Sequence, residues 1–179
     1  MRSKEFLRRE MLNLRNGLSL ADADEKSRII GEIFLNLFGQ KESFLLYSSV
    51  NNEVRTKFII DTLYKNGKLV YLPKYSKGGF ISALYNGETS MVKGKFGVME
   101  PDSMDSRDKF DVIAIPGVAF GLDFNRIGMG KGYYDTMLKK VKGLKVGLSY
   151  QFQIVDGIDT DPWDEKMDMI ITEENIYRR

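Results

Sequence analysis

Short apolar segments alternate with amphipathic segments along this chain, and this alternation restricts its possible folds more than any other feature. Residues 43–49 (SFLLYSS) form an apolar run bounded by polar residues, which is typical of a buried strand. A stretch with helical spacing follows and ends at Asn66 and Gly67, and residues 68–73 (KLVYLP) then indicate a second strand. Because a strand, a helix and a strand in this order form a βαβ unit, we predict an α/β fold with a mostly parallel sheet.

The same alternation returns in the second half of the chain. Residues 111–116 (DVIAIP), 145–150 (KVGLSY) and 167–172 (MDMIIT) have the composition of strands. A helix is predicted between the first two of these segments, from about residue 133 to residue 141. Residues 80–85 (FISALY), in the middle of the chain, indicate a hairpin or an excursion at the edge of the sheet.

Two amphipathic helices are predicted before the first strand. Apolar side chains of the first helix recur at spacings of four, three and four residues, at Leu7, Met11, Leu14 and Leu18. Basic side chains lie beside this stripe, at Lys4, Arg8, Arg9 and Arg15. Ser19 is a suitable N-cap for the second helix, and Gly39 is placed to end it.

The size and charge of the chain exclude several classes of partner. With 179 residues the chain has the size of one domain, and we treat residues 1–179 as a single unit. Lys and Arg number 27 and Asp and Glu 25, so the net charge of +2 is too balanced for binding bulk nucleic acid or an anionic membrane. We therefore expect neither partner. We also expect the chain to be a monomer. The N-terminal residues lack the apolar stretch of a secretory signal, and a cytoplasmic location is expected.

The absence of cysteine and histidine restricts the chemistry of any active site. Without cysteine the chain can form no disulfide, no thiolate nucleophile and no thiolate-bound metal. Without histidine it can build neither a Ser-His triad nor a His-bound zinc site. Catalysis must then rely on carboxylates, Lys, Arg, Tyr, backbone amides or oxygen-bound cations.

Glycines and basic residues gather just before the helix predicted near residue 133. They are Arg126, Gly128, Gly130, Lys131 and Gly132. Glycines let backbone N–H groups approach an anion, and the N-terminus of the following helix adds partial positive charge. The segment is therefore a candidate phosphate-binding loop, with a flexible surface loop as the alternative. Its spacing fits neither the dinucleotide-binding fingerprint nor the P-loop, since Gly132 follows Lys131 where a P-loop has Ser or Thr.

Several charged side chains have both a structural and a functional interpretation. Asp135, in the first turn of a helix, could interact with the helix dipole or bind Mg²⁺ together with Asp168. Lys4 and Arg8, one turn apart, could face a polyphosphate or form a solvated helix surface. Glu53 could be a helix N-terminal charge or a carboxylate that binds substrate.

Ligands of open α/β sheets bind outside the carboxyl ends of the strands. Three segments follow predicted strands directly, namely 48–53, 116–135 and 151–153. We therefore expect these three segments to line one crevice.

Five segments together resemble the 5-formyltetrahydrofolate cyclo-ligase family, whose members are also called methenyltetrahydrofolate synthetases. The segments are Lys4-x-x-x-Arg8, 48–56 (SSVNNEVRT) with the following KLVYLP, 97–101 (GVMEP), 111–135 (DVIAIPGVAFGLDFNRIGMGKGYYD) and the tail 164–173. The resemblance implies a single three-layer α/β/α sandwich around a mostly parallel sheet. It also implies conversion of 5-formyltetrahydrofolate to 5,10-methenyltetrahydrofolate with ATP and Mg²⁺, releasing ADP and phosphate.

The resemblance also assigns expected roles to individual residues. It implies ATP binding by Lys4, Arg8, Arg126, Gly128, Gly130, Lys131, Gly132, Tyr133 and Tyr134. It implies Mg²⁺ at Asp135 and Asp168, and folate contacts near Ser48 and Glu53. Of the ATP-binding set, Arg126, Lys131 and Tyr133 are expected to serve catalysis. The chain departs from the family at Trp163-Asp164, where a His-Asp pair is common.

The expected reaction suits a chain without cysteine or histidine. In our hypothesis the formyl oxygen attacks the γ-phosphorus of ATP, the folate N10 closes the ring onto the activated carbon, and phosphate leaves. No protein nucleophile is required, because phosphoryl transfer depends mainly on positioning and charge stabilisation. Two alternatives remain at this point: a nucleotide-binding regulatory module without catalysis, and an ATP-dependent kinase or ligase that acts on another small acid.

Overall fold

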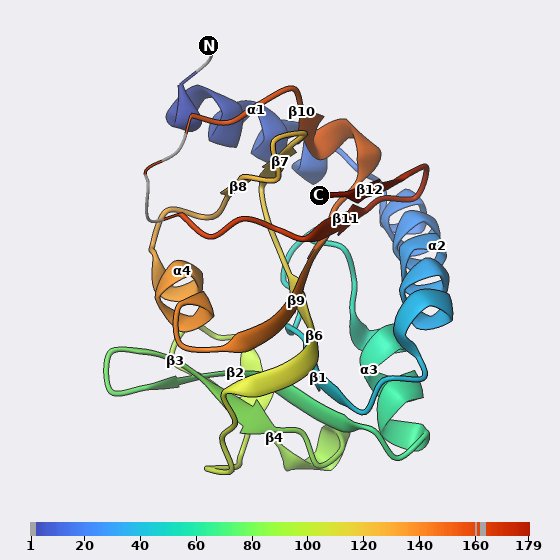
Figure 1. The fold of residues 1–179 in the computed structure, drawn as a ribbon, viewed down its shortest axis with the longest axis vertical. Helices are drawn as coiled ribbons and strands as arrows, with labels where there is room; N and C mark the ends of the chain where they lie inside the picture. The colour runs from blue at the N-terminus through green and yellow to red at the C-terminus, as the bar shows by residue number, and fades with distance from the viewer. Residues whose placement is uncertain (1–2, 160, 162–163) are drawn as a thin grey trace.

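The computed structural model describes residues 3–159, 161 and 164–179. Its largest sheet has seven strands in the order β12-β11-β9-β6-β1-β2-β3 (Figure 1). These strands are β1 (Ser43–Leu45), β2 (Leu69–Ser76), β3 (Gly79–Leu84), β6 (Lys109–Ile115), β9 (Lys142–Leu148), β11 (Met169–Ile171) and β12 (Ile176–Arg178). The strands β11, β9, β6, β1 and β2 run parallel, and the edge strands β12 and β3 are antiparallel to their neighbours. The α/β fold predicted from the alternation is confirmed.

Helices cover both faces of this sheet. They are α2 (Leu20–Phe38), α3 (Lys57–Lys65) and α4 (Tyr133–Leu138). Figure 1 shows α2 and α3 on one side of the sheet and α4 on the other. Side chains of β6 alternate between the layers, because Val112 and Ala114 join the core under α2 and α3, while Ile113 and Ile115 join the core under α4. Each large apolar side chain buried in this way contributes about 1.5–3 kcal/mol, so both faces of the sheet need a helical cover. The three-layer arrangement is confirmed.

The first helix, α1 (Lys4–Asn16), differs from its predicted pattern. Ser3 caps it, as Ser19 caps α2. Its buried face consists of Leu7, Met11 and Arg15, spaced four residues apart, whereas Leu14 is 51% exposed. The predicted stripe was therefore wrong in its third position, where an arginine replaces the expected leucine. No helix among the described residues is long and apolar enough to cross a membrane.

A second, three-stranded sheet lies under α1 (Figure 1). It consists of β7 (Ala119–Gly121), β8 (Arg126–Ile127) and β10 (Ile154–Val155). Leu7 and Met11 of α1 pack in one apolar cluster with Ala119 and Ile127 of this sheet and with Val118, which precedes β7. The segment 116–135 thus contains a β-hairpin of β7 and β8, which anchors the glycine-rich loop that follows.

The middle of the chain forms the predicted excursion at the sheet edge. The strand β3 pairs antiparallel with β2 as a hairpin. Beyond it, β4 (Met91–Lys93) and β5 (Met99–Pro101) pair with each other in a two-stranded sheet, after a short 3-10 helix, η1 (Glu88–Ser90). The turn at 94–98 between β4 and β5 supplies residues to the pocket described next.

Candidate functional site

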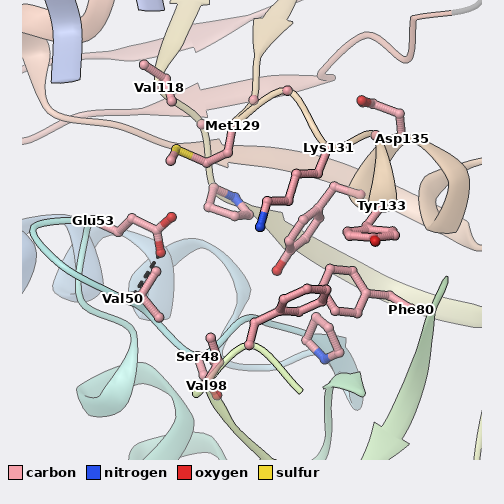
Figure 2. A pocket seen from close by; sticks show the side chains of 18 of the residues that line it. Ser48, Val50, Glu53, Phe80, Val98, Val118, Met129, Lys131, Tyr133 and Asp135 are labelled. Atoms are coloured by element: carbon pink, nitrogen blue, oxygen red, sulfur yellow. Dashed lines mark hydrogen bonds between the residues drawn. The ribbon is translucent and has the colours of Figure 1, made fainter. Parts of the chain in front are cut away.

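A pocket with a cavity of about 470 Å³ lies where the chain leaves β1 and β6. Its lining comes from the segments 48–53, 96–100, 116–118 and 126–135, with Pro73 and Phe80 from the β2–β3 hairpin. Figure 2 shows Glu53 and Lys131 reaching into the pocket from opposite sides. Two of the three segments predicted to line one crevice therefore meet here.

The third segment, η2 (Gln151–Gln153), supports the pocket from behind instead of lining it. The buried amide of Gln153 donates to the carbonyl oxygens of Val118 (2.7 Å) and Gly117 (3.2 Å). Its own oxygen accepts from the Tyr150 backbone N–H at 3.1 Å. The expectation that this segment lines the crevice is thus corrected: it fixes the 116–118 segment, which does line the pocket.

The glycines of the loop at 128–132 have specific conformational roles. Gly130 (φ 89°) and Gly132 (φ 69°) adopt left-handed conformations that other residues rarely adopt. At Gly128, a Cβ atom would lie 2.9 Å from the Arg126 guanidinium. The loop is therefore a tightly built turn, which disfavours the alternative of an unconstrained surface segment. The helix that follows is shorter than predicted, because α4 ends at Leu138.

Two of the expected cations lie at this loop. Arg8 of α1 donates from Nε to the Gly128 carbonyl oxygen at 2.9 Å, and its guanidinium also lies beside Gly130. The Lys131 side chain points into the pocket (Figure 2), with its ammonium 4.8 Å from the centre of the Phe96 ring. The fold thus brings α1 and the glycine-rich loop together, although more than a hundred residues separate them.

The other expected cation of α1, Lys4, is occupied elsewhere. Its ammonium lies 3.1 Å from an Asp164 carboxylate oxygen and 3.4 Å from one of Asp161. Burial opposes the charged form of Lys4, but the hydrogen bond to Asp164 and the charges of both aspartates outweigh it and raise the pKa of Lys4. Lys4 is not among the residues that line the pocket. The neighbouring Trp163 lies outside the described residues.

Arg126 and Asp135 form an ion pair at the pocket wall. Arg126 Nη2 donates to Asp135 Oδ1 at 2.5 Å, and its Nη1 donates to the Pro116 carbonyl oxygen at 3.2 Å. The Arg126 side chain is only 4% exposed, whereas that of Asp135 is 41% exposed. The guanidinium thus ties the glycine-rich segment to the start of α4, and the carboxylate remains accessible from the pocket.

The structure does not bring Asp168 to this pocket. Asp168 precedes β11 and therefore lies at the amino end of a parallel strand, away from the carboxyl ends. One of its carboxylate oxygens accepts from the Lys145 backbone N–H at 2.9 Å, and the other pairs with Arg179 at 3.0 Å. The expected pair of magnesium ligands, Asp135 and Asp168, is thus not assembled. No group of three or more acidic side chains suited to a metal occurs in the described part of the chain.

Glu53 is the acidic side chain at the end of the pocket opposite the glycine-rich loop (Figure 2). One of its carboxylate oxygens accepts from the Val50 backbone N–H at 3.0 Å. Burial raises the pKa of Glu53, and the Val50 hydrogen bond and the charge of Arg15 partly offset this shift. Ser48 lines the same end of the pocket. The two expected folate-binding residues therefore lie together in the structure.

Aromatic side chains form one wall of the pocket. Tyr133 packs against Phe80 and Phe96, with ring centres 5.4 Å apart in both pairs, and against Tyr75 at 5.9 Å. Tyr134 also packs against Phe80, with ring centres 5.6 Å apart, and burial raises the pKa of its phenol far above the ordinary value. Sequence reasoning missed Phe80 and Phe96, and the only signal for them was an aromatic-rich stretch without clear periodicity.

Solved structures with this fold define the class of enzyme first. The NMR structure of 5,10-methenyltetrahydrofolate synthetase from Aquifex aeolicus has a TM-score of 0.89 and 35% identity, covering 98% of this chain and 92% of that one. The synthetase structure from Mycoplasma pneumoniae has a TM-score of 0.76 and 27% identity, covering 96% and 99%. A fold of this kind, with a ligand-sized pocket at the carboxyl ends of its strands, is therefore that of a folate-metabolising synthetase.

The family follows from the sequence itself. The model of the 5-formyltetrahydrofolate cyclo-ligase family matches residues 1–173. The 5-formyltetrahydrofolate cyclo-ligase of Haemophilus influenzae is 31% identical over 173 residues, which cover 90% of this chain and 92% of that protein. This chain belongs to the 5-formyltetrahydrofolate cyclo-ligase family, whose members are ATP-dependent ligases. The resemblance noted from the motifs is thereby confirmed.

Proposed function

We propose that this chain converts 5-formyltetrahydrofolate to 5,10-methenyltetrahydrofolate with ATP, releasing ADP and phosphate. Family membership supports the reaction. The observation that carries the proposal for this chain is the meeting of Lys131 and Glu53 in one cavity of about 470 Å³ (Figure 2). The cation on the glycine-rich loop suits the phosphates of ATP, and the carboxylate on the facing loop suits the N–H groups of the folate. The two substrates would then lie side by side.

The triphosphate is assigned to the loop at 128–132. Left-handed glycines at Gly130 and Gly132 open the backbone toward an anion, and Lys131 and Arg8 supply positive charge at the loop. Lys4 lies one turn before Arg8 and could add a third cation after its pairs with the nearby aspartates open. Tyr133 and Tyr134 supply flat aromatic surfaces beside the loop, which suit an adenine or pterin ring.

The residues present fit a magnesium ion that is bound mainly through the nucleotide. Mg²⁺ usually takes one or two protein carboxylates and completes its coordination with phosphate oxygens and water. Asp135 is a half-exposed carboxylate on the pocket wall, which matches that requirement, and we assign the ion to Asp135 alone. When bound there, the ion would neutralise charge on the phosphates. Asp168 is left out of the proposal because its carboxylate is bonded at the amino ends of the parallel strands, away from the pocket.

The folate is assigned to the end of the pocket that contains Ser48 and Glu53. Its N5-formyl group is an amide whose oxygen leaves poorly, so the oxygen must be activated before the ring closes. In the proposed reaction the formyl oxygen attacks the γ-phosphorus and ADP leaves. N10 then attacks the formyl carbon and loses its proton, the C–O bond breaks, and phosphate leaves with that proton. Lys131 stabilises the charge that develops on the transferred phosphoryl group, and the protein supplies no covalent intermediate.

One assay separates this proposal from the two alternatives. The purified chain is mixed with ATP, Mg²⁺ and 5-formyltetrahydrofolate, and the ultraviolet absorbance of the methenyl product is followed. Product formation that depends on ATP supports the proposal. Nucleotide binding without product would favour a regulatory module, and ATP hydrolysis that requires a different small acid would favour another kinase or ligase.

A further inference from the structure

The proposed arrangement of the substrates leaves one part of the folate without a contact. 5-Formyltetrahydrofolate consists of a pterin, a p-aminobenzoyl ring and a glutamate with two carboxylates. With the pterin at Glu53 and the formyl group beside the loop at 128–132, the rest of the molecule extends toward the other side of the pocket. Figure 2 shows Phe80 on that side, away from Glu53. We therefore expect the glutamate to leave the pocket past the aromatic wall.

The aromatic wall offers a flat surface for the p-aminobenzoyl ring. Phe80 and Phe96 both line the pocket, with ring centres 6.3 Å apart. Phe96 belongs to the turn at 94–98 and is 39% exposed, so this end of the wall reaches solvent. A ring that packs against this wall places the attached glutamate at the rim of the pocket.

Lys95 is held at this exposed end of the wall. Its ammonium donates to the Tyr75 hydroxyl at 3.0 Å, and it lies 4.4 Å from the centre of the Tyr75 ring and 5.9 Å from that of Phe96. These contacts restrict a side chain that would otherwise move freely in solvent. The turn is closed by its own backbone, because the Gly94 N–H donates to the Val98 carbonyl oxygen at 2.8 Å. The position of the ammonium is therefore fixed before a ligand binds.

The charge of Lys95 is available to a ligand. Lys95 forms no ion pair within the part of the chain that the structure describes. Glu100, the acidic residue of the same hairpin that lines the pocket, instead accepts from the Tyr75 backbone N–H at 3.1 Å. An ammonium has three donors, and the bond to the Tyr75 hydroxyl uses one, so two remain. The other cation near Phe96 is Lys131, 4.8 Å from the ring centre and assigned to the phosphates.

We propose that Lys95 binds a carboxylate of the glutamate of 5-formyltetrahydrofolate and makes the site selective for folates that carry this glutamate. This inference rests on the proposed function, which places the pterin at Glu53. The pair would be a charge-assisted hydrogen bond. Because Lys95 is exposed, solvent and salt weaken such a pair, and its contribution to affinity is modest. Lys131 and Lys95 thus serve two different anionic groups, the phosphates inside the pocket and the carboxylate at its rim.

The test compares two substrates that differ only in the glutamate. They are 5-formyltetrahydrofolate and 5-formyltetrahydropteroate, which lacks it. We expect Lys95→Met to raise the KM for 5-formyltetrahydrofolate about threefold to tenfold, with less than about a twofold change in the KM for the pteroate and for ATP. Added salt should raise the KM for 5-formyltetrahydrofolate in the wild-type chain more than in the variant. Lys93→Met removes an exposed lysine from β4 of the same hairpin and is the control, which should leave all three KM values unchanged.

Two results would overturn the inference. One is an equal effect of Lys95→Met on both substrates, because it indicates a contact with another part of the ligand or a structural role. The other is an unchanged KM for 5-formyltetrahydrofolate. If the wild-type chain forms no methenyl product, the proposed function fails, and calorimetric binding of the same two compounds still tests Lys95. The wild-type chain should then prefer the compound with the glutamate and Lys95→Met should lose that preference, whereas binding of neither compound also overturns the inference.

Discussion

The buried guanidinium of Arg126 is bonded to the half-exposed carboxylate of Asp135, with a distance of 2.5 Å between Nη2 and Oδ1. The two members of this pair face different environments, since Arg126 is enclosed by protein and Asp135 meets the pocket. Removing Arg126 should therefore have a different effect from removing Asp135. The sequence alone indicated phosphate binding by Arg126 and metal binding by Asp135, and the structure bonds these two side chains to each other.

Arg126→Ala should reduce both stability and activity. The substitution removes the bond to Pro116 and leaves a gap beneath the loop. Breaking a fully buried ion pair typically costs about 3–5 kcal/mol of unfolding free energy. We expect a smaller loss here, because water can reach Asp135. Chemical denaturation and initial rates measure the two effects. An inactive variant with unchanged stability would place Arg126 in direct contact with phosphate instead.

Asp135→Asn should act mainly on the magnesium dependence. The amide keeps the shape of the side chain and can still accept a hydrogen bond from Arg126, so the melting temperature should change little. We expect the Mg²⁺ concentration for half-maximal rate to rise about tenfold or more. Even residues that only hold a metal ligand in place typically change metal affinity by about that factor when they are mutated. Asp168→Asn is the comparison, because the Asp168 carboxylate lies at the amino ends of the parallel strands, away from the pocket. An unchanged magnesium titration in the first variant would remove Asp135 from the site.

Lys131→Ala should lower turnover without loss of stability. Its side chain points into the pocket, and its described contact is with the face of the Phe96 ring. A charge-assisted hydrogen bond to phosphate contributes about 1.5–3 kcal/mol, so the rate should fall about 10- to 100-fold. Lys139→Ala, at the C-cap of α4 and outside the pocket, controls for the loss of a surface lysine. A similar loss in both variants would contradict the assignment.

Glu53 should make both folate binding and stability depend on pH. Burial raises its pKa above the ordinary value, so it becomes protonated at a higher pH than an exposed glutamate. The KM for 5-formyltetrahydrofolate should rise as pH falls through that raised pKa. The unfolded chain loses this proton first as pH increases, so stability should fall between the two pKa values. Glu53→Gln should flatten both profiles, and unchanged profiles would count against the assignment.

The sequence predicted what depends on local patterns. The period of apolar residues gave the α/β fold, and the Ser19 cap and the glycine-rich loop were visible as short motifs. In α1 the periodicity allowed either Leu14 or Arg15 at the third buried position, and only packing against the small sheet decides between them. The position of Asp168 could have been predicted from the sequence, because a residue that precedes a parallel strand lies at the amino end of that strand, away from the expected ligand site.

The rest of the site depends on contacts between segments far apart in the chain. Phe80 and Phe96 meet Tyr133 only after the β2–β3 hairpin and the β4–β5 turn fold over the start of α4. Neither segment has a period that indicates its partner. The bond between Arg8 and Gly128 likewise requires α1 to pack on the second sheet, which had not been predicted. Local sequence patterns contain no signal for such pairings.

Gly130→Ala should weaken ATP binding through the conformation of the loop. Gly130 has a φ of 89°, where an alanine is strained by about 1–2 kcal/mol, and its relaxation would move the loop away from Arg8. We expect the KM for ATP to rise about tenfold while the KM for 5-formyltetrahydrofolate changes much less. Gly67→Ala is a matched control, because Gly67 has a φ of 73° in the turn after α3, outside the pocket. If both variants lose the same stability and neither alters the KM for ATP, the loop at 128–132 does not bind the triphosphate.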